Sequence, residues 1–330
     1  MATSAAAASE GHVAQATRAA LARGNAVDAV VAGVLAAVAA SPGVLLGPVQ
    51  ILVAGAGAGL LVVDGRVRQP GLGAPRPRGT VAGDAVPRAA RVGVPAMPAA
   101  LAAALAAAGS VTMRRVCLDA VEAAREASGE RAAVLASLAR RGAPAMADEA
   151  IAGELAAVAG RAAGGVLTGR DLASVRPALA HPKERALEPE GWLRAPWREG
   201  ADASRAHVVV AADRRGLLCA ACYESTEEGV PVPALGLVAP ALASPVMRGE
   251  TRVRPGEPRP SAAPIAIRVR NGLADLAVGI GVLADAEGAL DRLLPRLDET
   301  PLVADAIGAS AGRGVAVART RESAVVAASA

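Results

Sequence analysis

The fold is decided by the stretch Ala206-His207-Val208-Val209-Val210-Ala211-Ala212, followed by Asp213-Arg214-Arg215-Gly216 and Leu217-Leu218-Cys219-Ala220-Ala221-Cys222-Tyr223. Two apolar runs of about seven residues flank a polar turn that ends in glycine, which predicts a buried antiparallel hairpin. The chain before it is mostly alanine-rich and helical in pattern, and the chain after it reads as strands and loops. Any chemistry is expected at the start of the first strand, near Ser204, Arg205 and His207.

Other elements follow from periodicity and from the residues that begin or end them. We expect helices over residues 9–22, 26–40, 99–108, 114–127, 131–141, 148–163 and 285–294. Strands are predicted over 45–53, 60–63, 265–270, 274–278, 315–317 and 324–327. Asn271-Gly272 is a strong signal for a two-residue hairpin turn. Asp64-Gly65 is also interpreted as a tight turn.

The glycine-alanine segment 54–59 has the look of a phosphate-binding loop. A phosphate loop of this kind needs a helix after it and a Lys-Ser or Lys-Thr pair, and neither is present. The segment is therefore interpreted as a connection between two strands.

Composition excludes several classes of function. The 330 residues give ample chain for a core, with no Phe, one Tyr and a net charge of +4. No basic run is interleaved with aromatic residues, so we expect no nucleic-acid partner. No apolar run is long enough to cross a bilayer, and the first ten residues lack the features of a secretory leader. We therefore expect a cytoplasmic protein without a membrane partner.

The three cysteines do not form a disulfide pattern. Cys219 and Cys222 form a C-x-x-C sequence within a predicted strand. Their odd separation places the two side chains on opposite faces, where they cannot share a metal or form a disulfide. They are interpreted as core thiols, and the sequence predicts no metal site and no cofactor.

Three segments together resemble the γ-glutamyltransferase family of the N-terminal-nucleophile hydrolases. They are Gly24-Asn25-Ala26-Val27-Asp28-Ala29, similar to G-G-N-A-V-D-A; residues 164–172, similar to G-G-x-L-T-x-x-D-L; and His207 through Asp213 and Gly216, similar to T-T-H-x-S-V-x-D-x-x-G. Residues 92–95 and 259–264 add weaker matches to V-G-V-P-G and R-P-L-S-S-M-x-P.

The resemblance implies an α+β fold, a four-layer αββα sandwich with two antiparallel sheets between helical layers. It divides the chain into a large-subunit-like half over 1–180, a shortened linker over 181–203 and a small-subunit-like half over 204–330. The three parts are expected to form one compact domain.

The family's reaction can be compared with this sequence residue by residue. Members cut themselves before a threonine, whose freed amine then serves as base for its own hydroxyl. The T-T that should precede His207 is Arg205-Ala206, and arginine has no hydroxyl. Ser204 lies one residue earlier, and a slip of one in a strand turns a side chain to the other face.

Other parts of the family's site are also replaced. The arginine that holds the glutamyl carboxylate falls at about Gly71, and the N-N-x-x-D-D that grips the amine has no counterpart between Gly236 and Ser244. The paired glycines of the oxyanion region fall near Val282-Leu283, while one serine of the S-S pair is retained as Ser261. We expect a single uncleaved chain, a pseudoenzyme for γ-glutamyl transfer.

Three functions remain open at this point. The first is an enzyme repurposed for acid/base chemistry on a small metabolite, with Ser204, Arg205 and His207 as catalytic candidates. Its substrate-binding candidates are Glu224, Thr226, Glu227 and Ser261. The second is a non-catalytic member that binds a small molecule, forms a homo-oligomer or partners an active homologue. The third is acyl transfer with Ser204 as nucleophile. The repurposed enzyme has a simpler alternative. The acidic residues after Tyr223 also fit a solvated loop, and His207 also fits a buried structural residue.

Overall fold

The computed structural model describes residues 4–55, 57–75, 77–181, 190–197, 202–226, 228–299, 313–319 and 324–328. Two antiparallel sheets packed face to face form its centre. The first has the order β1-β6-β7-β2-β3-β4 and the second β13-β12-β11-β10-β5. The strands of the first are β1 (Ala5–Ala8), β2 (Val49–Gly55), β3 (Gly59–Gly65), β4 (Ala178–Ala180), β6 (Ala206–Ala212) and β7 (Leu217–Glu224). Those of the second are β5 (Glu190–Leu193), β10 (Ile265–Arg270), β11 (Leu273–Gly281), β12 (Arg313–Arg319) and β13 (Ala324–Ala328).

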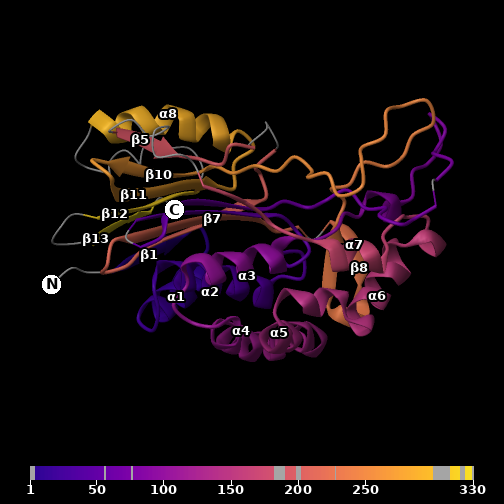
Figure 1. Cartoon of the computed structure of the whole chain (residues 1–330), viewed down its shortest axis with the longest axis horizontal. Helices are drawn as coiled ribbons and strands as arrows, with labels where there is room; N and C mark the ends of the chain where they lie inside the picture. The colour runs from indigo at the N-terminus through magenta and orange to yellow at the C-terminus, as the bar shows by residue number, and fades with distance from the viewer. Residues whose placement is uncertain are drawn as a thin grey trace.

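Helices cover the outer face of each sheet (Figure 1). The first sheet is covered by α1 (Gly11–Leu21), α2 (Ala26–Ala40) and α3 (Met97–Ala108), with α4 (Met113–Ala127) and α5 (Gly129–Arg141) beyond them. The second sheet is covered by α8 (Ala286–Glu299). This arrangement of helix, sheet, sheet and helix confirms the predicted α+β, four-layer αββα sandwich.

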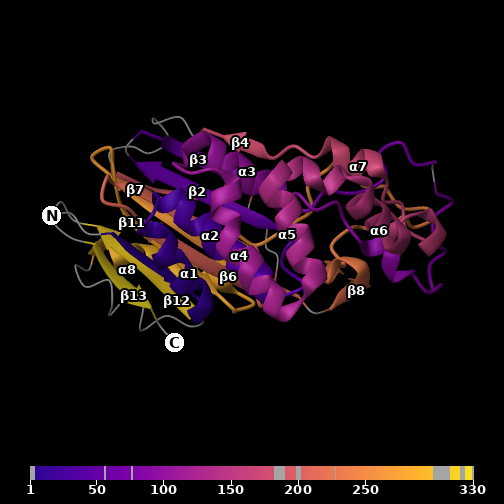
Figure 2. The same cartoon turned by 90° about the horizontal axis from the view of Figure 1, so that it is seen from below.

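The remaining elements gather at one end of the molecule (Figure 2). They are α6 (Glu149–Ala159), α7 (Gly169–Ser174) and the two-stranded sheet of β8 (Gly229–Val232) and β9 (Leu237–Pro240). No helix among the described residues is both long and apolar enough to cross a membrane.

The predicted hairpin is confirmed as β6 and β7, paired from Ala206↔Glu224 to Ala212↔Leu218. Its two faces are both buried, as the continuous apolar runs require. Val209 belongs to the core beneath the helices, whereas Val208 belongs to the core between the sheets. Cys219 and Cys222 divide in the same way, and both are free and buried. Burial raises the pKa of each thiol, so both are protonated core residues.

Three parts of the chain differ from the sequence-based expectation. The alanine run of β1 has helical propensity, but it pairs with β6 and is therefore a strand. Asp64-Gly65 is not a turn: both residues belong to β3, and the turn between β2 and β3 lies near Ala58. The stretch interpreted as a linker, 181–203, contains β5, which pairs with β10. The division of the chain into two subunit-like halves stays a prediction.

Candidate functional site

The start of β6 lies beside the end of β7 and the start of β2. Ala206 pairs with Glu224, and Tyr223 pairs with Val49. Ala206 is fully buried in the core between the two sheets, so its partner Glu224 also faces this space. The candidate site is therefore an edge where three strand ends of the first sheet meet the space between the sheets.

Arg205 precedes β6 and is attached to the loop that follows β7. Its Nη1 donates a hydrogen bond to Thr226 Oγ1 at 2.9 Å, and its Nη2 forms an ion pair with the Glu228 carboxylate. The main chain adds a bond from the Ser225 N–H to the Arg205 carbonyl at 3.1 Å. Both side chains of the ion pair are largely exposed, so it contributes little to stability, but it fixes the position of the guanidinium. Glu227 lies outside the described residues.

Gly43, after α2, permits this loop to lie where it does. A Cβ at position 43 would fall 1.5 Å from the Thr226 carbonyl oxygen. Any side chain there would displace the main chain that holds Arg205.

Glu224 and Ser261 form a polar pair at the same edge. The Ser261 hydroxyl donates to Glu224 Oε1 at 3.0 Å. Burial raises the pKa of Glu224 to about 6, while the hydrogen bond from Ser261 and the charge of Arg205 oppose the rise and the charge of Asp202 adds to it. Near neutral pH, a carboxyl group of this kind is able to take up or release a proton.

The raised pKa of Glu224 predicts a pH-dependent stability. Between the unfolded value, about 4.3, and about 6, the folded chain binds more protons at this residue than the unfolded chain, so stability falls as pH rises. We expect the free energy of unfolding of the wild type, minus that of Glu224→Gln, to fall by about 2 kcal/mol between about pH 4 and pH 7. Urea unfolding of both proteins at several pH values measures this difference.

Glu228→Gln is the matched control, because the Glu228 side chain is 77% exposed. The free energy of unfolding of Glu228→Gln should depend on pH in the same way as that of the wild type. A difference between wild type and Glu224→Gln that stays constant with pH would contradict the burial of a titrating carboxyl group.

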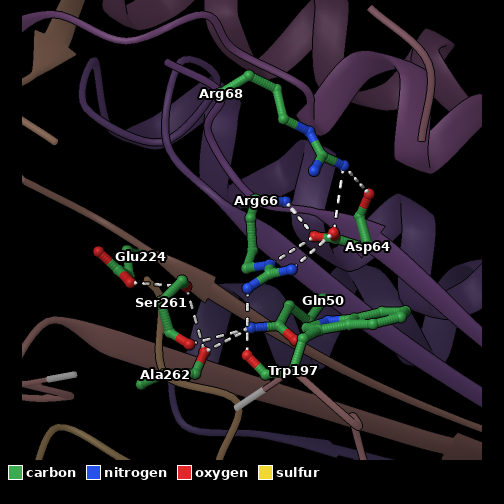
Figure 3. A network of polar contacts seen from close by, with 8 residues as sticks. All are labelled: Gln50, Asp64, Arg66, Arg68, Trp197, Glu224, Ser261 and Ala262. Atoms are coloured by element: carbon green, nitrogen blue, oxygen red, sulfur yellow. Dashed lines mark hydrogen bonds and ion pairs between the residues drawn. The ribbon is translucent and has the colours of Figure 1, made fainter. Parts of the chain in front are cut away.

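A buried glutamine sets the position of Ser261 (Figure 3). Gln50 Nε2 donates to the carbonyls of Ser261 and Ala262 at 3.2 and 3.3 Å. Gln50 Oε1 accepts the indole N–H of Trp197 at 2.7 Å, so residues just before the start of β6 are docked on β2. This contact was not predicted from the sequence. Its signals were a single polar residue in the apolar run 45–53 and one of only two tryptophans.

The network continues into a buried charged group on and after β3. Asp64 is 1% exposed; Arg66 Nε donates to its Oδ1 at 3.0 Å, and Arg68 Nη2 lies 3.2 Å from its Oδ2. Arg66 Nη1 also donates to the carbonyl of Trp197 at 3.2 Å. Trp197 is thus held at its indole by Gln50 and at its main chain by Arg66 (Figure 3).

His207 lies on the other face of the first sheet. It stacks on Tyr223, with ring centroids 5.5 Å apart, and its Nδ1 lies 3.4 Å from Glu10 Oε2. Tyr223 donates its hydroxyl hydrogen to the same carboxylate, in the layer beneath the helices. Burial lowers the pKa of His207, although the charge of Glu10 opposes this. The structure therefore brings together Arg205, Glu224, Thr226 and Ser261, and it does not bring His207 to them.

Ser204 is exposed and is hydrogen-bonded to Asp202. Its main-chain N–H donates to Asp202 Oδ1 at 2.8 Å. Hydrogen bonds from the main chain and the hydroxyl of Ser204 hold the pKa of Asp202 below its usual value. A carboxylate with a lowered pKa is a weak base, so this contact does little to activate the hydroxyl.

Val282 lies where the resemblance places the oxyanion glycines. Its φ of 57° is in the left-handed region, which favours glycine and is unusual for a β-branched residue. Its N–H donates to the Ala206 carbonyl at 2.7 Å. The backbone bend expected of a glycine is present, but this N–H is already occupied.

Four cavities among the described residues lie away from this edge. None of these four is lined by Ser204, Arg205, His207, Glu224, Thr226 or Ser261. In the same part of the chain, no group of three or more His, Cys, Asp or Glu side chains is arranged to hold a metal ion.

Comparison with known proteins rests on structure alone. No protein-family model matches the sequence. No curated protein matches it either. A cephalosporin acylase from Bacillus halodurans is similar, with a TM-score of 0.74, 15% identity and coverage of 99% of this chain and 96% of that one. The structure of LmbA2991HD is similar at a TM-score of 0.76 and 16% identity, with the same coverage.

A γ-glutamyltranspeptidase from Pseudomonas nitroreducens, in complex with L-DON, matches less of the chain. The match covers 55% of this chain and 68% of that one, at 19% identity and a TM-score of 0.46. The identities of the two longer matches are low, so they establish the architecture and not the reaction. The chain therefore shares the four-layer αββα architecture of these two structures over almost its whole length.

Proposed function

We propose that this chain is a non-catalytic protein of the γ-glutamyltransferase type, which stays uncleaved and acts by binding. The observation that carries the proposal is the placement of Arg205. By the sequence resemblance it stands where the family has its threonine, just before β6, and its guanidinium contacts Thr226 and Glu228. The loop after β7 is thereby held to the residue that stands in the nucleophile's place in this proposal.

Chemistry supports the same conclusion. An N-terminal nucleophile needs a hydroxyl or thiol next to an amine that self-cleavage sets free. Arg205 supplies no hydroxyl. Ser204 is hydrogen-bonded to the carboxylate of Asp202, which is a weak base. The tetrahedral intermediate also needs free donors, and the Val282 N–H is taken by Ala206.

The test uses the purified full-length chain. Intact-mass spectrometry should give one species of full-length mass. Incubation with γ-glutamyl-p-nitroanilide should release no nitroaniline and leave the mass unchanged, because neither Arg205 nor Ser204 is set up to form an acyl-enzyme. An active γ-glutamyltransferase, assayed in parallel, shows that the conditions support the reaction. Two fragments divided within residues 203–205, or an added glutamyl mass, would contradict the proposal.

A second candidate function is favoured by one observation, the pairing of Glu224 with Ser261. A carboxyl group with a pKa of about 6 suits general acid/base chemistry on a small metabolite. If this function holds, turnover of a small amide or ester should be abolished by Glu224→Gln and kept by Glu228→Gln. Equal activity in both variants, or none in the wild type, would exclude it for the compounds assayed.

A further inference from the structure

A separate cavity of 370 Å³ lies at the other end of the two sheets. It is lined by the turns between β2 and β3, between β6 and β7 and between β10 and β11, together with the end of β12. These turns are separated from Ala206 by the length of β6, about 20 Å at about 3.3 Å per residue. The cavity is therefore distinct from the edge that holds Arg205 and Glu224.

One part of the wall of this cavity is apolar, and glycine brings the turns that form it together. Leu60, Val269 and Leu273 line it, and Leu273 is 58% exposed although it is a large apolar residue. Gly55 has a φ of 127°, and a Cβ there would lie 2.0 Å from the Gly216 carbonyl oxygen. Glycine at this position lets two hairpin turns touch and so closes one side of the cavity. The volume is at the small end of the range for ligand pockets, about 300 to 1,000 Å³.

Two arginines line the same cavity, Arg215 and Arg319. Arg319 Nη2 donates to the Arg214 carbonyl at 3.3 Å, while its buried Nε has no hydrogen-bond partner in the described part of the chain. Among the described residues, neither guanidinium lies within ion-pair distance of a carboxylate. An apolar space next to two cations that have no anionic partner in the described part of the chain is typical of a site for an organic anion.

We propose that this cavity binds a small monocarboxylate with an apolar body. The planar guanidinium matches the two oxygens of a carboxylate, and the charge-assisted hydrogen bonds are strong. The apolar side chains favour an organic body over a free inorganic ion, because they pack against a hydrocarbon group but cannot form hydrogen bonds with a hydrated ion. This proposal does not depend on whether the start of β6 is inert.

The test measures binding of 4-phenylbutyrate to the full-length chain by isothermal titration calorimetry. Arg215→Gln and Arg319→Gln should each weaken binding about tenfold, the usual effect of losing one hydrogen bond between charged groups. Arg214→Gln is the matched control: it removes the same charge from the adjacent residue, which does not line the cavity, and should change affinity by less than about twofold. The neutral 4-phenylbutyramide should bind about tenfold more weakly than the acid.

The apolar part has its own pair of variants. Leu273→Ser should weaken binding about fivefold, whereas Leu118→Ser, at a leucine on α4 that is also exposed, should have no effect. Circular dichroism checks that each variant is folded. The proposal is overturned if no saturable binding is seen, if Arg214→Gln weakens binding as much as Arg215→Gln, or if inorganic phosphate binds as well as the acid.

Discussion

Asp64→Ala is expected to lower the free energy of unfolding by about 3 to 5 kcal/mol, the usual cost of removing one partner from a buried ion pair. Asp64 is 1% exposed, and the side chains of Arg66 and Arg68 beside it are 10% and 11% exposed. Without the carboxylate, the buried guanidinium groups of Arg66 and Arg68 would lie next to each other without the negative charge of Asp64 to offset their repulsion. Urea unfolding followed by circular dichroism measures the loss.

Asp285→Ala is the matched control for this variant. Asp285 also forms an ion pair with an arginine, Arg292, but both side chains are about two-thirds exposed. Asp285 also caps α8, because its Oδ1 accepts from the N–H of Gly288 at 3.2 Å, so its loss should cost about 0.5 to 2 kcal/mol, still well below the cost of Asp64→Ala. Equal stability of the Asp64→Ala and Asp285→Ala variants would show that the buried ion pairs of Asp64 do not hold β3 and the residues around Trp197 together.

The hairpins were predictable because their signals are local. The apolar runs around residues 213–216 and the Asn271-Gly272 turn specify strand, turn and strand within about twenty residues, without knowledge of the rest of the chain. The strand β1 was not predictable in this way. Four alanines favour a helix locally, and only their pairing with a strand about two hundred residues later makes them a strand.

The candidate site was predictable in part for a similar reason. Arg205, Glu224 and Thr226 lie at the two ends of one hairpin, so pairing alone brings them together. The alternation of side chains along β6 places His207 on the face opposite to Ala206, which separates it from Glu224. Gln50, Asp64 and Trp197 could not be foreseen, because their contacts join β2, β3 and a segment near residue 197 through tertiary packing.

The motifs that carry the family resemblance have structural roles in this chain. Asn25 caps α2, and Asp28 completes the capping box. Thr168 and Asp171 form a second capping box on α7, and Asp171 also accepts hydrogen bonds from the N–H groups of Gly71 and Leu72. Such residues are needed to build the fold whether or not a reaction takes place. The resemblance at these motifs is therefore accounted for by their structural roles.

Asp28→Ala is therefore expected to act on the fold, with a loss of about 3 kcal/mol or more. Asp28 is 1% exposed, and its carboxylate accepts from the N–H of Asn25 at 2.8 Å, from both the N–H and the hydroxyl of Ser110, and from the N–H of Val111 at 3.2 Å. Removing it leaves several poorly solvated donors without a partner, each costing about 1 to 3 kcal/mol. Thermal and urea unfolding measure the effect.

Asp119→Ala provides the comparison, because Asp119 lies on the neighbouring α4 and its ion pair with Arg23 is largely exposed. It should cost no more than about 1 kcal/mol. At a temperature where Asp28→Ala is still folded, its affinity for 4-phenylbutyrate should equal that of the wild type. Asp28 does not line the cavity that contains Arg215 and Arg319. A stable Asp28→Ala protein with weakened binding would assign this motif residue to function and contradict its role as a structural cap.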